Sequence, residues 1–101
     1  MKKIQNRSEF RKNKKSGHPA YIYAKVGNDF VYLGLTHSDV TQGVKNIKLE
    51  HSPDPYSNDV VFIRSSSEKL RTNKFSKQTY KNWSFTENDQ KKINKIKKRT
   101  K

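Results

Sequence analysis

The stretch HPAYIYAKVGNDFVYLGLTHS, residues 18–38, decides the fold of this chain. Two runs with alternating apolar side chains flank Asn28 and Asp29, and both residue types tolerate the positive φ angles of a two-residue hairpin turn. Gly27 precedes them and relieves the approach to the turn. The pattern therefore predicts a β-hairpin.

The expected register starts from a pair between Gly27 and Phe30, and it places the aliphatic side chains on one face, the predicted core face. The predicted aliphatic pairs are Val26–Val31, Ala24–Leu33 and Ile22–Leu35. The opposite face is expected to be a tyrosine surface with a glycine gap that another chain could approach closely. It carries Tyr21, Tyr23, Lys25, Tyr32, Gly34 and Thr36.

The open end of this hairpin collects polar side chains. The register places His18 near Asp39 and sets Thr36 across from Tyr21, with His37 and Ser38 next along the chain. Two imidazoles and two hydroxyls are therefore expected within a few residues of one another.

Composition limits what surrounds the hairpin. The chain has 101 residues, of which 30% are hydrophobic, so one small domain with one sheet and one helix is expected. The absence of cysteine excludes disulfides and thiolate metal sites. No apolar run approaches the ~20 residues that cross a bilayer, and no apolar segment follows the N-terminal charges. We expect a soluble cytoplasmic protein without a membrane partner.

The net charge of +14 is unevenly distributed. Lys and Arg outnumber acids by seven to one in residues 1–16, six to one in 60–85 and seven to two in 86–101, whereas 17–59 carry three against five. Clustered cations favour a polyanionic partner such as RNA, because each neutralised phosphate releases a counterion. Terminal lysines that only maintain solubility are the alternative.

The rest of the chain gives weaker signals. Residues 1–16 are predicted to be a basic, flexible arm, or a segment that orders on binding, and residues 17–101 a single domain. Strands are expected at 44–49 and at 60–63, the latter covered on both faces, with a proline-containing loop at 52–59 between them. The segment 68–75 is ambiguous, with a short strand favoured around 70–75.

A C-terminal helix over about 87–97 has the clearest local signature. Thr86 is a good N-cap with Asp89 three residues on, and acids precede lysines along the helix. Ile93 and Ile96 are its only strong apolar contacts, so we expect a lightly packed helix whose start is anchored by two aromatic residues, Trp83 and Phe85.

This order of elements resembles the PemK/MazF-like toxin family. The matching segments are residues 18–22, 33–38, 59–64 and 83–89, and the resemblance spans roughly residues 17–97. It implies a mainly β fold, a small twisted SH3-like barrel with a C-terminal helix, that cleaves RNA without a metal or other cofactor. It also implies a homodimer, and it leaves open whether a protein partner is an antitoxin or another protein.

Two features depart from the family pattern. His18 stands where the family has a catalytic arginine before proline, and the basic arm replaces the strand before it, so the barrel lacks a strand unless part of residues 3–12 supplies one. Thr36 matches the family's catalytic threonine, and Arg64 lies near a basic residue that several members use.

Metal-free RNA cleavage needs a base, an acid and positive charge on the phosphorane. We assign His18 as general base or acid, His37 as its complementary partner, Thr36 as a hydroxyl donor and Arg64 as a bidentate phosphate clamp. Expected nucleic-acid contacts are Tyr21, Tyr23, Lys25, Tyr32, Ser38, Arg71 and Lys74.

Each assignment has a structural alternative. His18 and Arg64 would also suit exposed positions at strand ends, Thr36 a strand terminus, and the tyrosines ordinary strand positions. His37 falls on the inner face by parity, where a partly buried histidine is common. His51 beside the proline loop has no acid spacing that would suggest a zinc site.

Three functions follow from these patterns. The first is a toxin-type endoribonuclease. The second is a non-catalytic module of a phage or mobile element that binds RNA, DNA or a nucleic-acid enzyme. The third is an inhibitor whose basic charge faces an acidic protein surface.

Overall fold

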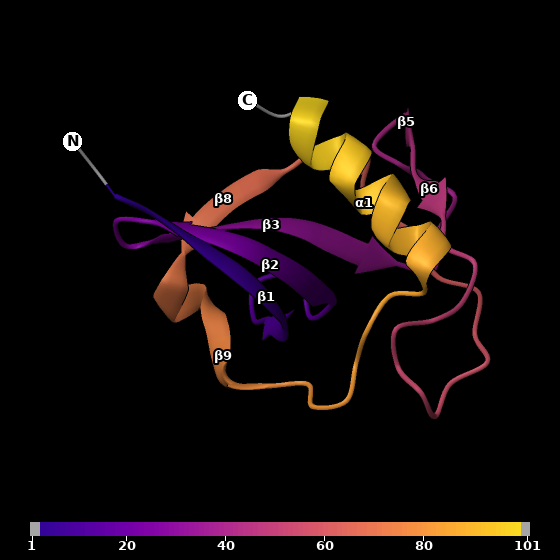
Figure 1. Cartoon of the computed structure of the whole chain (residues 1–101), viewed down its shortest axis with the longest axis horizontal. Helices are drawn as coiled ribbons and strands as arrows, with labels where there is room; N and C mark the ends of the chain where they lie inside the picture. Colours follow the sequence, from indigo (N-terminus) through magenta and orange to yellow (C-terminus); the bar gives the residue numbers. More distant parts are fainter. Residues whose placement is uncertain (1–2, 100–101) are drawn as a thin grey trace.

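The computed structural model describes residues 3–99, and their fold is mainly β with one C-terminal helix (Figure 1). The main sheet has the strand order β6-β7-β3-β2-β1-β9, with β8 paired to β3 off this path, and β4 and β5 form a separate small sheet. The strands are β1 Ile4–Asn13, β2 Pro19–Val26, β3 Asp29–Thr36, β4 Val40–Thr41, β5 Val44–Lys45, β6 Ile47–Lys48, β7 Phe62–Ile63, β8 Glu68–Arg71 and β9 Phe75–Thr79.

The predicted flexible arm is instead an internal strand of the sheet, next to its edge strand β9. β1 pairs with β2 on one side and with β9 on the other (Figure 1). Phe10 anchors it, because its ring is 5% exposed and packs against Tyr21, Trp83 and Phe85. The arm prediction is therefore wrong for residues 4–13, and part of residues 3–12 does supply an extra strand. Residues 1–2 lie outside the described chain.

The hairpin forms, but in a different register. Its two-residue turn is Gly27–Asn28, with Val26 opposite Asp29, because Gly27 takes the positive φ of 61°. An L-residue adopts that angle only at a cost, and a turn with glycine first matches the right-handed twist of the strands. The predicted turn at Asn28–Asp29 is thus wrong by one position.

A bulge at Tyr23 then changes which residues share a face. Ile22 lies opposite Tyr32 while Ala24 lies opposite Val31, so Tyr23 is the extra residue on β2. A one-residue shift moves side chains to the other face of a sheet. Beyond the bulge Tyr21 therefore pairs with Leu33, and the prediction of one aliphatic and one tyrosine face is wrong.

Both faces of the hairpin are buried. One cluster contains Tyr21, Leu33 and Leu35 together with the helix residues Ile93 and Ile96. The other combines the alternate hairpin positions Ala20, Ile22, Phe30 and Tyr32 with Phe75 of β9. Tyr21 and Tyr32 are only 3% and 5% exposed, so neither can stack on a base as predicted.

The segment after residue 67 turns sharply between two strands. β8 pairs with β3, a short 3₁₀ helix, η1 (Thr72–Lys74), follows, and β9 then pairs with β1. β8 and β9 are joined by only this short helix, yet they pair with β3 and β1, which lie on either side of β2 in the sheet. The favoured short strand around 70–75 is in fact two strands joined by this 3₁₀ turn.

Residues 37–67 connect β3 to β8 and contain the short strands β4, β5, β6 and β7. The predicted strand over 44–49 divides into β5 and β6, which belong to different sheets, since Asn46 bonds to Ser38 and Thr41 rather than continuing a strand. The predicted strand at 60–63 is confirmed only for β7, and Val60 is exposed rather than covered.

The C-terminal helix α1 (Glu87–Arg99) is confirmed with its predicted start. The backbone N–H of Asp89 donates to Thr86 Oγ1 at 3.1 Å, which is the expected N-cap bond. Ile93 and Ile96 are fully buried against the sheet, and Trp83 and Phe85 pack beside the same cluster. Figure 1 shows the helix lying across the end of β3.

Candidate active site

Two adjoining hollows lie at the open end of the hairpin. The first has about 130 Å³ and the second about 190 Å³, and both are lined by His18, Pro19, Leu35 and Thr36. His37 lines only the first hollow and Arg64 only the second. The four predicted catalytic residues therefore gather around one shared wall.

The backbone register explains why His18 and Thr36 meet. Ala20 pairs with Gly34, and continuing that register by two residues brings His18 level with Thr36. The turn before β2 is held by a hydrogen bond from the Asn13 N–H to the His18 carbonyl at 2.9 Å. Thr36, rather than Asp39 as predicted, is thus the cross-strand neighbour of His18.

The environment of Thr36 leaves its hydroxyl proton available. Its Oγ1 accepts the backbone N–H of Ser38 at 3.2 Å, so the oxygen is oriented by an accepted bond. A hydroxyl that accepts one bond can still donate its own proton to a ligand. Thr36 Oγ1 is accordingly placed as a donor in the shared wall.

His37 is exposed, not on the inner face as parity suggested, because β3 ends at Thr36. Its Nδ1 lies 3.1 Å from the carbonyl oxygen of Val60. A carbonyl can only accept, so this contact places the proton on Nδ1 and leaves a lone pair on Nε2 in the neutral ring. His37 is therefore oriented as a proton acceptor.

Arg64 reaches its hollow across Gly34. The Arg64 N–H donates to the Gly34 carbonyl at 2.9 Å, and a Cβ on Gly34 would come within 3.3 Å of Arg64 Cγ. The glycine gap expected to admit another chain is thus occupied by this protein's own arginine. The Arg64 side chain is only 21% exposed, and its Nη1 lies 3.6 Å from Glu68 Oε1.

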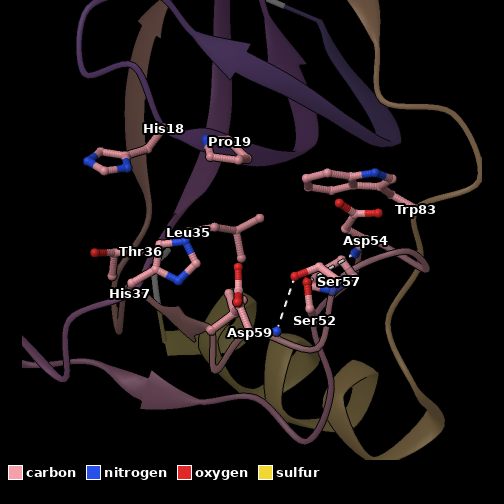
Figure 2. A pocket seen from close by; sticks show the side chains of 12 residues that line it. His18, Pro19, Leu35, Thr36, His37, Ser52, Asp54, Ser57, Asp59 and Trp83 are labelled. Atoms are coloured by element: carbon pink, nitrogen blue, oxygen red, sulfur yellow. Dashed lines mark hydrogen bonds between the residues drawn. The ribbon is translucent and has the colours of Figure 1, made fainter.

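Figure 2 shows the first hollow, with His18 and Pro19 above Thr36 and His37, and Trp83 beside Asp54 on the opposite side. Sequence reasoning assigned no site role to Asp54, Asp59 or Trp83, which also line this hollow. Tyr80 stacks on Trp83 with ring centroids 4.3 Å apart and fixes its plane. The composition of residues 52–59 indicated only a loop. That this loop lines the same hollow as His37 is visible only in the tertiary structure.

The second hollow has a polar floor built around Tyr32. The Tyr32 hydroxyl donates to Glu68 Oε2 at 2.9 Å and accepts from Asn13 Nδ2 at 3.4 Å. Burial, followed by the neighbouring Glu68 carboxylate, raises the pKa of Tyr32 to about 12. This phenol therefore serves as a buried neutral bridge between β1, β3 and β8.

The raised pKa of Tyr32 predicts a loss of stability at high pH. In the unfolded chain Tyr32 ionises with the ordinary tyrosine pKa of 10.0, whereas in the folded chain it keeps its proton to about 12. Its contribution to the free energy of unfolding is therefore full below pH 10 and is lost as the pH rises to 12. From about pH 9 to about pH 11 the free energy of unfolding should fall by about 1.4 kcal/mol more than in Tyr32→Phe. Urea titrations at both values measure the difference, and parallel losses would contradict it.

The other predicted nucleic-acid contacts do not line either hollow. Lys25 and Arg71 lie near the hairpin turn, where Arg71 pairs with Asp29. Tyr23 is half-buried, its hydroxyl bonds to the Ser67 hydroxyl, and the Lys97 ammonium lies 5.1 Å from its ring centroid. Ser38 is exposed directly after Thr36, and Lys74 is exposed at the end of η1.

Comparison with models of protein families, with curated proteins and with solved structures finds no match for this chain. The resemblance to PemK/MazF-like toxins therefore stays a prediction.

Within residues 3–99 no helix combines the length and the apolar character needed to cross a bilayer. Over the same residues no three His, Cys, Asp or Glu side chains come together as ligands for a metal ion.

Proposed function

We propose that this chain is a metal-independent endoribonuclease of the toxin type, similar to an mRNA interferase, that acts in the cytoplasm. The observation that carries the proposal is the gathering of His18, Thr36, His37 and Arg64 around two hollows with a common wall. Two imidazoles, one alcohol and one guanidinium are the groups that phosphodiester transesterification needs.

In the proposed reaction the ribose 2′-oxygen attacks the adjacent phosphorus and the bond to the 5′-oxygen breaks. His37 suits the base because its Nε2 carries the lone pair, and protonated His18 then donates to the departing 5′-oxygen. Thr36 donates to a non-bridging oxygen, and Arg64 neutralises the phosphorane from the second hollow. The products are a 2′,3′-cyclic phosphate and a free 5′-hydroxyl.

Trp83 supplies the stacking surface that the buried tyrosines cannot. It lines the first hollow and is held parallel to Tyr80, within 12°. Base stacking on an aromatic ring is worth about 1–3 kcal/mol. We infer that the nucleotide carrying the attacking hydroxyl places its base against Trp83.

We also propose that the sheet belongs to the SH3-like barrel class. The support is the pairing order, in which β8 and β9 flank a 3₁₀ turn and pair with β3 and β1 respectively. The resemblance to PemK/MazF-like toxins, rather than the barrel class, is the basis for also proposing toxin biology, with a homodimer and an antitoxin as partners. Expression that arrests growth, relieved by a neighbouring gene product, tests it.

The reaction is tested by incubating purified protein with mixed RNA in EDTA. His18→Ala and His37→Ala should each lower cleavage by about 10²–10⁴-fold, since each removes a proton-transfer group. His51→Ala is the matched control, because His51 is exposed and lines neither hollow, and it should cleave within about two-fold of wild type. Equal cleavage by all three variants, or none by wild type, would overturn the proposal.

A non-catalytic nucleic-acid-binding module is the second candidate. Exposed lysines on α1 and around the β1–β2 turn favour it, because they lie outside both hollows. RNA binding that weakens steeply with salt, together with intact RNA after long incubation, would support this module over the enzyme.

A further inference from the structure

A basic groove borders the β1–β2 turn, whose residues also line the candidate active site. It consists of two adjoining hollows of about 440 and 320 Å³ that share Lys14 and Asn73. The cations on its lining are Arg11, Lys14, Lys15, Lys74 and Lys77, and no acidic residue lines it. Such a surface is complementary to an anionic chain.

The lysines of the groove are not neutralised internally. Among residues 3–99, no carboxylate lies within 4.0 Å of the ammonium groups of Lys14, Lys15, Lys74 or Lys77. Arg11 differs, because its guanidinium bonds to Glu9 and to the carbonyls of two β9 residues at 3.0 and 2.7 Å. Arg11 therefore has a structural role in linking β1 to β9 beside the groove, and the four lysines remain available for a ligand.

The backbone holds two of these lysines in place. The Lys14 N–H donates to the Lys74 carbonyl at 2.8 Å, which ties the β1–β2 turn to η1. The Lys15 N–H donates to Oδ1 of the buried Asn13 at 2.9 Å. Charges from two separate segments are thus brought together before any ligand binds.

The same turn connects the groove to the candidate active site. Lys14 and Lys15 line the groove, whereas Ser16 and His18 line the second hollow. Lys15 and His18 are three residues apart, so their Cα atoms are separated by at most about 11 Å. A short stretch of extended nucleic acid covers this distance.

We propose that the basic groove holds the backbone phosphates of single-stranded RNA flanking the nucleotides in the candidate active site. The inference rests on the proposed function, which assigns RNA cleavage to the candidate active site. Binding of RNA to the groove is measured independently of cleavage. Long single strands should therefore bind better than a trinucleotide, and the gain should depend on the groove lysines.

The test compares two triple variants that lose the same charge. Lys14→Gln/Lys15→Gln/Lys74→Gln removes the groove cations, and Lys91→Gln/Lys95→Gln/Lys98→Gln removes exposed helix cations. The probe is a 20-nucleotide RNA with 2′-O-methyl riboses, which cannot be cleaved. The groove variant should bind it at least about 10-fold more weakly than wild type near 0.1 M salt, with a salt slope reduced by about 2. The helix variant should stay within about three-fold, and a trinucleotide should not distinguish the variants.

Equal losses in both variants, or no loss in the groove variant, would overturn the inference. So would groove-dependent binding to vesicles of anionic lipid without RNA binding. Cleavage of unmodified RNA by wild type is scored separately. If the wild type binds RNA through the groove but never cleaves it, the endoribonuclease proposal is wrong and the groove is still an RNA-binding surface. If the groove variant cleaves RNA with an unchanged KM, the groove proposal is wrong and the endoribonuclease proposal stands.

Discussion

Replacing Phe10 with alanine is expected to lower the free energy of unfolding by about 3–5 kcal/mol. The ring is 5% exposed and lies 5.1 Å from Tyr21, 5.6 Å from Trp83 and 5.1 Å from Phe85, measured between centroids. Its removal leaves a cavity between the sheet and the segment that leads into α1, and three aromatic neighbours lose their contact. Urea unfolding followed by circular dichroism measures the change.

Ile4→Ala is the matched control for Phe10→Ala. Both residues lie on β1, but Ile4 is 66% exposed, so its truncation should change the free energy of unfolding by less than about 0.5 kcal/mol. Nearly equal effects of the two substitutions would show that residues 4–13 behave as the arm predicted from composition, and not as a packed strand of the sheet.

Asp89→Ala is expected to destabilise the fold by about 3–4 kcal/mol. The carboxylate is fully buried and accepts the backbone N–H of Glu50 at 2.8 and 2.9 Å and that of His51 at 3.2 Å. The substitution leaves two partly buried N–H donors without this acceptor and exchanges a buried carboxylate for a cavity, and an unsatisfied buried donor costs about 1–3 kcal/mol. The substitution also removes an anion from the first turn of α1, where the helix dipole favours negative charge.

Asn88→Ala separates this effect from a general weakening of the helix. Asn88 is adjacent and exposed, and its side chain makes one hydrogen bond, to Glu50 Oε2 at 2.9 Å. Its loss should cost less than about 1 kcal/mol. Chemical denaturation of both variants provides the comparison, and a loss for Asp89→Ala no greater than for Asn88→Ala would contradict the proposed tie between α1 and residues 50–51.

Local signals explain the parts of the fold that were predicted. The helix start at Thr86 depends on a cap bond three residues away, and the hairpin depends on turn residues between two strands. The gathering of His18, Thr36 and His37 followed as well, because residues at the open end of a hairpin meet in any nearby register. Arg64 joined them through β7, which pairs beside Thr36.

The errors concern interactions across the sheet. The amino-acid pattern of residues 1–16 is mostly polar, with Ile4 and Phe10 as exceptions, and it does not show the pairing with β2 or the packing of Trp83 and Phe85 on Phe10. The prediction of a tyrosine surface was wrong because a single alternating run of residues shows neither the bulge at Tyr23 nor the burial of both hairpin faces.

The amino-acid sequence by itself determined the hairpin, the capped helix, the uneven basic charge and the set of residues at the hairpin's open end. Only the tertiary structure decided the register, the place of β1, the route of Arg64 over Gly34 and the meeting of Lys14 with η1. The physical reason is the distance along the chain between the residues that interact. Caps and turns are settled by neighbours in the chain, whereas register and face are settled by which distant side chains cover each surface.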